Sequence, residues 1–182
     1  MTATKRMRTE KICVLSMLTA LFVVLSMCLR VPVFDNFYLC LGYIAMFVAL
    51  AMYGILGGTI VGVCGTAIYC LLISGLRGMP GWICGNICIG VILGLWLQMT
   101  REISNKFLWY PSTILVIVIA NVVGILFTKS VVEMLLYAQP LMARVATNLP
   151  AFIADIAVLA AAIPVWKLLE PHIKKFTKTA EA

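Results

Sequence analysis

Residues 37–67 read FYLCLGYIAMFVALAMYGILGGTIVGVCGTA, and this stretch decides how often the chain can cross a membrane. It lies within an uncharged run of 41 residues, from Asn36 to Leu76. As one helix, that run would be about 60 Å long, roughly twice the hydrocarbon thickness of a bilayer. A break is therefore needed, and the glycines between Gly54 and Gly58 predict a tight turn there.

The rest of the chain is equally apolar. It has 182 residues, 63% of them hydrophobic and 12% charged, whereas a typical soluble domain has roughly 25% charged residues. A membrane crossing needs about 20 mainly apolar residues, and four further runs meet or approach that length. The sequence therefore predicts an all-α integral membrane protein, a six-transmembrane-helix bundle that forms a single domain over residues 1–182. Its helices are expected at about 12–29, 37–55, 58–74, 82–100, 110–128 and 147–168.

The basic residues predict which side each end occupies. Lys and Arg accumulate in cytoplasmic loops. Six helices with a cytoplasmic N-terminus place ten of the 14 basic residues inside, whereas merging the helices before and after Gly54 scatters them over both sides. Both termini are therefore expected in the cytoplasm. The apolar run after Lys11 is too long for a signal peptide, so it is interpreted as a permanent helix.

Glycines at helical spacing predict close packing of the central helices. Gly54, Gly58 and Gly62 are spaced by four, as are Gly81 with Gly85 and Gly90 with Gly94. Small residues at this spacing let membrane helices approach closely.

Asp155 is the most informative polar residue, because it lies inside the last predicted helix. Acids within a membrane usually face a ligand, a cavity or a partner group. The alternative to ligand contact is a hydrogen bond between helices or an ion pair with Arg77 or Lys129. Asn86 is predicted at a similar depth and is a candidate for the same site.

Polar and aromatic residues gather in the predicted outer connections, at 30–36 with Phe37 and Tyr38 following, at 74–81 and at 129–146. A small-molecule site that opens outward is expected above Asn86 and Asp155, although loops are also polar simply because water surrounds them. The candidate substrate-binding residues are Asn36, Tyr38, Arg77, Trp82, Asn86, Asn148, Phe152 and Asp155.

Several function classes are disfavoured. The sequence contains no GxxxxGK[ST] phosphate loop and no HExxH motif, and its one histidine, His172, follows the last predicted helix. The seven cysteines lie in apolar runs, where they behave as small hydrophobes. Neither an enzyme, a metal site nor a cofactor is therefore expected. The net charge of +7 comes from residues beside the helices, which favours anionic lipid over nucleic acid as the partner.

The pattern resembles the S components, the substrate-binding subunits of energy-coupling factor (ECF) vitamin transporters. The basic N-terminus runs into SMLTALFVVLS at 16–26, and GMPGWICGNICIG at 78–90 is similar to the family's loop into its fourth helix. The glycine-rich stretch at 37–67 and NLPAFIADI at 148–156 also match family elements.

The resemblance implies that this chain captures a vitamin or related micronutrient at the outer face of a bacterial cytoplasmic membrane. A coupling membrane protein and two cytoplasmic ATPases would then drive release inward. Ser16 and Ala20 match the small-residue face that meets the coupling protein in the family. Asn86, Asn148, Phe152 and Asp155 match positions that line the pocket.

The substrate stays open at this level. Riboflavin-type members have Asn and Lys where this chain has Phe152 and Asp155. An acid in the site favours a ligand with hydrogen-bond donors or positive charge, such as a pyrimidine, pyridine or purine-like ring. The alternatives to an S component are a self-contained secondary transporter or facilitator and a membrane scaffold subunit without a ligand.

Overall fold

The computed structural model describes residues 3–28, 32–34, 37–76, 78–100 and 106–181. Within these ranges, the side chains of 3–8, 28, 32–34, 37–38, 74, 106–107 and 174–181 are not described. Five described helices are long and apolar enough to cross a membrane. They cover Thr9–Met27, Gly42–Ile73, Met79–Met99, Leu108–Tyr137 and Leu141–Ile173.

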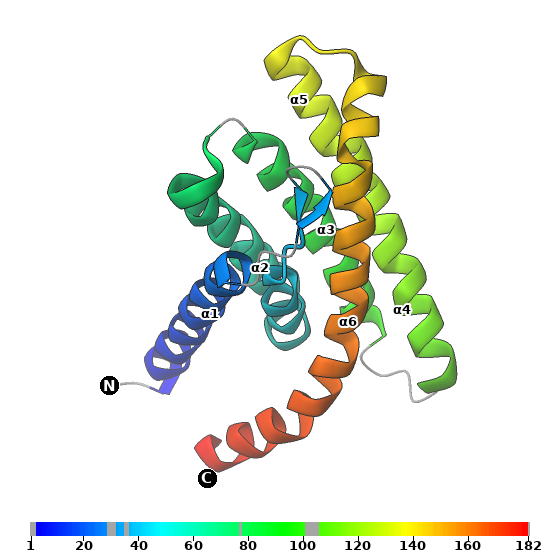
Figure 1. Cartoon of the computed structure of the whole chain (residues 1–182). Coiled ribbons are helices and arrows are strands. Elements are labelled where there is room, and N and C mark those ends of the chain that lie inside the picture. Colours follow the sequence, from blue (N-terminus) through cyan, green and yellow to red (C-terminus); the bar gives the residue numbers. More distant parts are fainter. Residues whose placement is uncertain (1–2, 29–31, 35–36, 77, 101–105, 182) are drawn as a thin grey trace.

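The elements follow one another with short connections (Figure 1). Two π-helical segments, η1 and η2, directly continue α2 and α4. A small antiparallel hairpin, β1 with β2, lies between α1 and α2 and packs against α6. The bounds are α1 (Ala3–Cys28), β1 (Pro32–Phe34), β2 (Phe37–Tyr38), α2 (Gly42–Tyr69), η1 (Cys70–Ser74), α3 (Met79–Met99), α4 (Lys106–Asn121), η2 (Val122–Lys129), α5 (Ser130–Tyr137) and α6 (Leu141–Glu181).

Gly54 reverses the direction of α2. Its backbone has φ 71° and ψ −160°, a conformation that only glycine adopts readily. A Cβ on Gly62 would lie 2.7 Å from Met46 Sδ, and one on Gly58 would collide with Leu50. In each pair the two residues are equally far from Gly54 in sequence, one before it and one after it. The two halves of α2 therefore run antiparallel and touch. The chain turns at the position that its glycines predict.

The glycines of α3 contact two different neighbours. A Cβ on Gly94 would lie 2.9 Å from Ile55 of α2, and one on Gly85 would lie 2.8 Å from the carbonyl oxygen of Gly124 in η2. At Gly85 and Gly124 the two backbones touch, because neither residue has a side chain to separate them. The close approach thus extends beyond the central helices to η2.

Two segments differ from their predicted structure. Helix α2 begins at Gly42, not near residue 37, because Phe37 and Tyr38 pair with the strand Pro32–Phe34. The predicted outer connection at 129–146 is mostly helical and leaves only Ala138–Pro140 between α5 and α6. Its charged residues, such as Glu133 and Arg144, pair with each other, so the helices continue without leaving them isolated.

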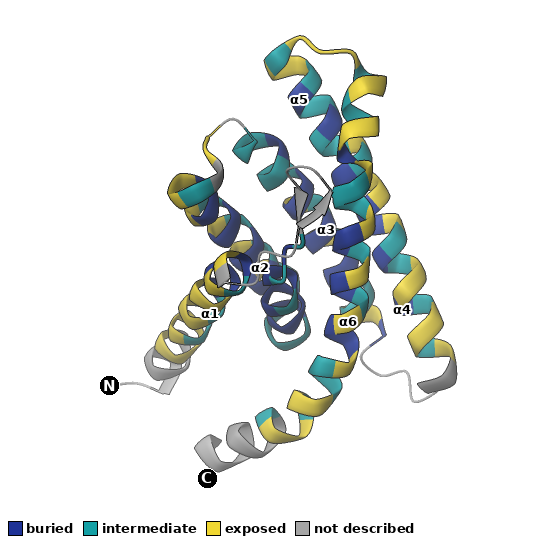
Figure 2. Cartoon of the chain, viewed as in Figure 1, coloured by how far each residue is buried: buried dark blue, intermediate teal, exposed yellow. Residues whose placement is uncertain are grey.

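The core lies around the first half of α2. Tyr43, Met46 and Phe47 are fully buried there. By contrast, only 17% of the residues in the apolar stretch of α1 are buried. In the apolar stretch that α2 forms with η1, the share is 56%. Figure 2 shows α1 as mainly exposed and α2 as mainly buried. The N-terminal end of α1 and the C-terminal end of α6 lie on the same side of the molecule, away from α5 (Figure 1).

Candidate functional site

Tyr43, near the start of α2, is the centre of a buried hydrogen-bond chain. Trp82 Nε1 donates to the Tyr43 hydroxyl over 2.8 Å, and that hydroxyl donates to Asn86 Oδ1 over 2.7 Å. Trp82 and Asn86 lie about one turn apart on α3, so both reach the same face of α2. The chain therefore joins α2 to α3 through polar groups in an otherwise apolar core.

Asn86 also binds the second half of α2. Its Nδ2 donates to the Thr66 hydroxyl over 2.6 Å and to the Gly62 carbonyl oxygen over 3.2 Å. Both amide hydrogens are thus used, while Oδ1 keeps one lone pair. Asn86 is fully buried, and its hydrogen bonds connect α3 to both halves of α2. To a ligand it can offer only an acceptor.

Asp155 of α6 lies next to the hydrogen-bond chain formed by Trp82, Tyr43 and Asn86. The residue is 5% exposed, and its side chain lies near the Tyr43 hydroxyl. It lies about 21 Å along α6 from the first residue, Leu141. A charge at such depth costs a few kcal/mol unless a partner or ligand compensates it. Tyr43, Asn86 and Asp155 together form what we call the buried polar cluster.

A second polar group lies closer to the α5 end. Asn148 Nδ2 donates to Ser130 Oγ over 3.1 Å and to Glu133 Oε2 over 3.2 Å, and Arg144 Nη1 lies 3.8 Å from that carboxylate oxygen. The Arg144 guanidinium also lies over the Tyr137 ring, 5.7 Å from its centroid. These contacts join α5 to α6, and we call Ser130, Glu133, Arg144 and Asn148 the Glu133 clasp.

Gly81 brings the start of α3 against η2 and α5. A Cβ on Gly81 would lie 3.0 Å from Glu133 Cγ and 3.2 Å from Lys129 Cγ. The absence of a side chain at this position lets α3 pack against the stems of both charged residues. Glu133 of the clasp and Lys129 therefore both lie against the start of α3.

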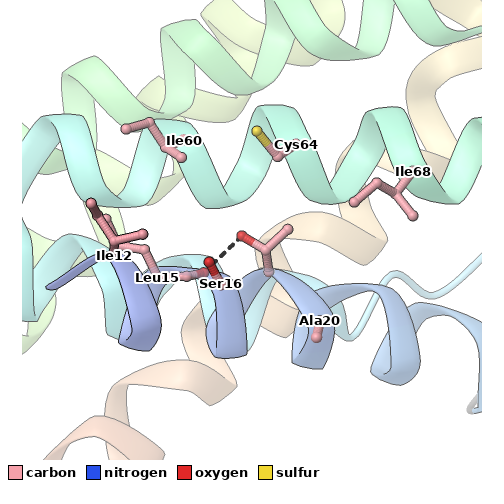
Figure 3. Close-up of a pocket in the computed structure, with 8 residues that line it drawn as sticks. Ile12, Leu15, Ser16, Ala20, Ile60, Cys64 and Ile68 are labelled. Atoms are coloured by element: carbon pink, nitrogen blue, oxygen red, sulfur yellow. Dashed lines mark hydrogen bonds between the residues drawn. The ribbon is translucent and has the colours of Figure 1, made fainter. Parts of the chain in front are cut away.

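A separate groove runs between α1 and the second half of α2 (Figure 3). It has a volume of about 440 Å³ and a mainly apolar lining. Ser16 and Ala20 are both exposed on its α1 wall, and Thr19 Oγ1 donates to the Leu15 carbonyl oxygen over 2.8 Å. The lining residues are Ile12, Leu15, Ser16, Thr19, Ala20, Ile60, Cys64 and Ile68.

No group of three or more His, Cys, Asp or Glu residues within the described ranges is placed to hold a metal ion. The buried polar cluster with Trp82 and the Glu133 clasp contain carboxylate, amide, hydroxyl, indole and guanidinium groups. Such a set can bind a polar organic molecule through hydrogen bonds.

The comparisons with known proteins identify the family. A family model described as "ECF-type riboflavin transporter, S component" matches residues 6–170, which is most of the chain. The chain belongs to this family. No individually curated protein matches the sequence.

The family confirms the resemblance found in the sequence. S components are membrane proteins that bind substrate for an ECF transporter, and they are not enzymes. The apolar helices agree with a multi-pass membrane protein. The helical membrane character is thus confirmed, whereas the β1–β2 hairpin departs from the predicted all-α fold.

The structure of this S component brings some predicted site residues together. Trp82, Asn86 and Asp155 all surround Tyr43, while Asn148 lies in the Glu133 clasp. Phe152, one turn before Asp155 on α6, is half-buried and packs against the core. Asn36 and Arg77 lie outside the described residues, and of Tyr38 only the backbone, in β2, is described.

Sequence reasoning missed Tyr43 and Glu133 as members of the site, and it considered Lys129 only as a structural partner of Asp155. Tyr43 stands in a long apolar run, where an aromatic residue gives no separate signal. Lys129 and Glu133 stood in a segment interpreted as a loop. Their i,i+4 spacing, which places both on one helix face, was the available signal.

Proposed function

We propose that this S component captures a flavin-type vitamin from outside the cell and delivers it inward with a coupling membrane protein and two ATPases. The observation that carries the proposal is the buried polar cluster of Tyr43, Asn86 and Asp155, in a chain whose family is named for riboflavin. Riboflavin contains a ring with N–H and C=O groups and a polyhydroxyl side chain. Carboxylate and amide oxygens accept hydrogen bonds from such N–H and O–H groups.

The proposed pocket lies between α2, α3 and α6, beside the β1–β2 hairpin. Asp155 provides the principal acceptor, and Trp82 and Phe152 provide aromatic surfaces for a planar ring. Asn86 contributes its free Oδ1 lone pair, and Asn148 completes the side toward α5. We retain the outer-loop residues Asn36, Tyr38 and Arg77 as proposed contributors to the entrance.

We further propose six membrane crossings with both termini in the cytoplasm. The reversal at Gly54 supports this number, because it divides the longest apolar span into two antiparallel parts. The common side of the two chain ends supports the topology (Figure 1), as does the clustering of Lys and Arg at these ends. Under this topology α5 and the Glu133 clasp face the exterior.

An accessibility experiment tests that topology. In a variant without native cysteines, a cysteine at Gln139 should react with a membrane-impermeant maleimide added to intact cells. A cysteine at Thr179 should react only after the cells are opened. The reverse labelling pattern would contradict the proposed orientation.

The α1 groove is the proposed contact surface for the coupling protein, with Ser16 and Ala20 at its centre. Both residues are small and exposed, and small residues permit close approach of another membrane helix. The low burial of α1 also supports this assignment.

Ligand identification is the direct test of the function. The chain is purified in mild detergent and denatured, and any released small molecule is identified by mass spectrometry. Riboflavin and a panel of other vitamins are then titrated against ligand-free protein. One stoichiometric flavin, or saturable riboflavin binding, would support the proposal. Binding of no vitamin, together with uptake driven by an ion gradient in the lone chain, would replace it with a secondary transporter.

The Asp155→Asn variant tests the site. A hydrogen bond to a charged group contributes about 1.5–3 kcal/mol, so affinity for the vitamin should fall by about 10- to 100-fold. Lys167→Met is the matched control, because Lys167 lies about 18 Å further along α6 than Asp155 and packs over Trp109. Equal affinities of the Asp155→Asn variant and the wild type would remove Asp155 from the site.

A further inference from the structure

Helix α6 is longer than one membrane crossing requires. Its apolar span Leu141–Ile173 has 33 residues. At 1.5 Å per residue this span is about 50 Å long, whereas the hydrocarbon core of a bilayer is about 30 Å thick. The helix then continues to Glu181. An overlong helix must tilt, bend or extend into the interface, so the last turns of α6 need surroundings other than the hydrocarbon core.

Aromatic side chains mark the membrane edge at this end of the molecule. Lys167 Nζ lies 4.6 Å from the Trp109 ring centroid, and Trp109 Nε1 donates to Thr100 Oγ1 over 3.3 Å. Trp166 directly precedes Lys167 and is half-buried. Tryptophans gather where the hydrocarbon meets water. Lys167 therefore lies at the edge of the hydrocarbon core, and we call residues 167–181 the α6 tail.

The α6 tail bends away from the rest of the helix. Figure 1 shows the end of α6, coloured orange to red, curving away from the axis of its upper part. Two prolines, Pro164 and Pro171, lie inside this part of the helix. Proline has no N–H to bond the carbonyl group four residues earlier, and it bends helices. The tail therefore departs from the direction in which α6 crosses the membrane.

One side of the tail is apolar. Leu168 and Leu169 are 72% and 40% exposed. At about 100° per residue, the helical register places Ile173 and Phe176 within about 40° of Leu169. Apolar positions thus follow one side of the tail for about two turns. Contact of this side with water is unfavourable, and burial in an apolar medium would stabilise it.

The opposite side of the tail is charged. Lys167 lies about 160° around the helix from Leu169, and the register places Glu170, Lys174 and Lys178 within about 60° of Lys167. With Lys175, the tail contains four lysines and two glutamates, so its net charge is +2. A helix with one apolar side and one lysine-rich side is typical of segments that lie on a membrane surface.

We propose that the α6 tail is an interfacial helix that binds the surface of the cytoplasmic leaflet. Leu168 and Leu169 contact acyl chains, while the lysine side contacts anionic lipid headgroups. An acidic protein surface would neutralise the lysines but leave the leucines in water, whereas an anionic bilayer satisfies both sides at once. The inference goes beyond vitamin capture, because it requires no ligand.

The test measures how deep each side of the tail lies in a bilayer. Phe176→Cys and Lys178→Cys are made separately in the full chain without native cysteines, and each cysteine carries an NBD fluorophore. The protein is placed in nanodiscs of phosphatidylcholine with phosphatidylglycerol. The label at position 176 should lie about 5–10 Å below the headgroup boundary and be quenched by nitroxides on the acyl chains. The label at position 178 should be quenched by aqueous iodide instead.

The preference for anionic lipid is tested at the same position, 176. A lysine near an anionic surface strengthens association about fivefold, so nitroxide on phosphatidylglycerol should quench this label about fivefold more efficiently than nitroxide on phosphatidylcholine. Changing Lys174, Lys175 and Lys178 together to Gln should make the two lipids equal quenchers. Changing the same three residues to Arg is the matched control and should preserve the preference, because the charge remains.

Two outcomes would overturn the inference. Iodide that quenches both labels equally would show that the tail extends into water. Equal quenching by the two lipids in the wild-type tail would show that anionic headgroups are not its partner. Riboflavin titration of the same nanodiscs reports on the proposed function separately. A tail that lies in the interface of a protein that binds no vitamin would contradict only the proposed function.

Discussion

The buried polar cluster and the α1 groove both interrupt apolar helices with small or polar side chains, but they differ in what surrounds them. Tyr43, Asn86 and Asp155 of α2, α3 and α6 are buried, and Tyr43 donates a hydrogen bond to Asn86. Ser16 and Ala20 are exposed in a groove with a mainly apolar lining. An enclosed site with hydrogen-bonded polar groups suits recognition of a small molecule. An open surface of small residues suits contact with another helix.

The contrast also separates two energetic roles. Each buried polar group must keep a hydrogen-bond partner, so changes in the cluster should affect both stability and binding. Residues in the groove have few contacts to lose, so changes there should leave the isolated protein intact. The following predictions test this separation, beginning with the largest expected effect.

Ala20→Trp should reduce vitamin uptake in cells to the background of cells that lack the protein. The indole would fill the α1 groove and block the approach of a coupling helix. Vitamin affinity of the purified protein should stay within about twofold of wild type, because the Ala20 side chain is exposed in the groove and not in the buried polar cluster. Ala161→Trp, at an exposed alanine of α6, is the matched control and should preserve uptake. Full uptake by the Ala20→Trp variant would remove the groove from the coupling surface.

Asn86→Ala should lower the free energy of unfolding by about 3 kcal/mol. It removes the bonds to Tyr43, Thr66 and Gly62, and each buried group left without a partner costs about 1–3 kcal/mol. Unfolding in detergent, monitored by tryptophan fluorescence, measures the change. Vitamin affinity should also fall, because Tyr43 and Trp82 lose their fixed positions. A stable variant with wild-type affinity would contradict both roles.

Gly85→Ala should lower the free energy of unfolding by about 1–3 kcal/mol, the usual range for an overpacked core position. The added methyl group would lie 2.8 Å from the Gly124 carbonyl oxygen, so α3 and η2 must separate. Gly78→Ala is the control. No atom lies within 4 Å of a Cβ there, and the change should stay within about 0.5 kcal/mol. Equal thermal stabilities of the two variants would show that the Gly85–Gly124 contact is not tight.

Lys167→Met should have the smallest effect, a loss of about 1 kcal/mol or less in the free energy of unfolding. Its ammonium lies 4.6 Å from the Trp109 ring centroid and 3.2 Å from Glu170, and both contacts are partly solvated. Thermal unfolding and riboflavin titration of the same sample measure stability and binding together. A large loss of affinity would show that this end of α6 takes part in binding.

Much of the site's composition was predictable, but its geometry was not. Asp155 stood out because an acid within an apolar helix is costly, and Asn86 because of its predicted depth. Tyr43 gave no comparable signal. Lys129 and Glu133 were hidden in a segment whose charges indicated a loop. The pairing of Glu133 with Arg144 and Asn148 of α6 is not visible in the local sequence.

The sequence by itself determined that this is a helical membrane protein, that the chain breaks at Gly54 and that its last helix contains an acid. These features depend on the length of apolar runs, on glycine's backbone freedom and on the cost of charge in lipid. Only the tertiary structure decided which face of each helix points inward. Lipid is as apolar as the protein interior, so a helix that is hydrophobic all round does not mark its buried face. Contacts such as Tyr43 with Asn86, and Asn148 with Glu133, therefore emerge only when the helices pack together.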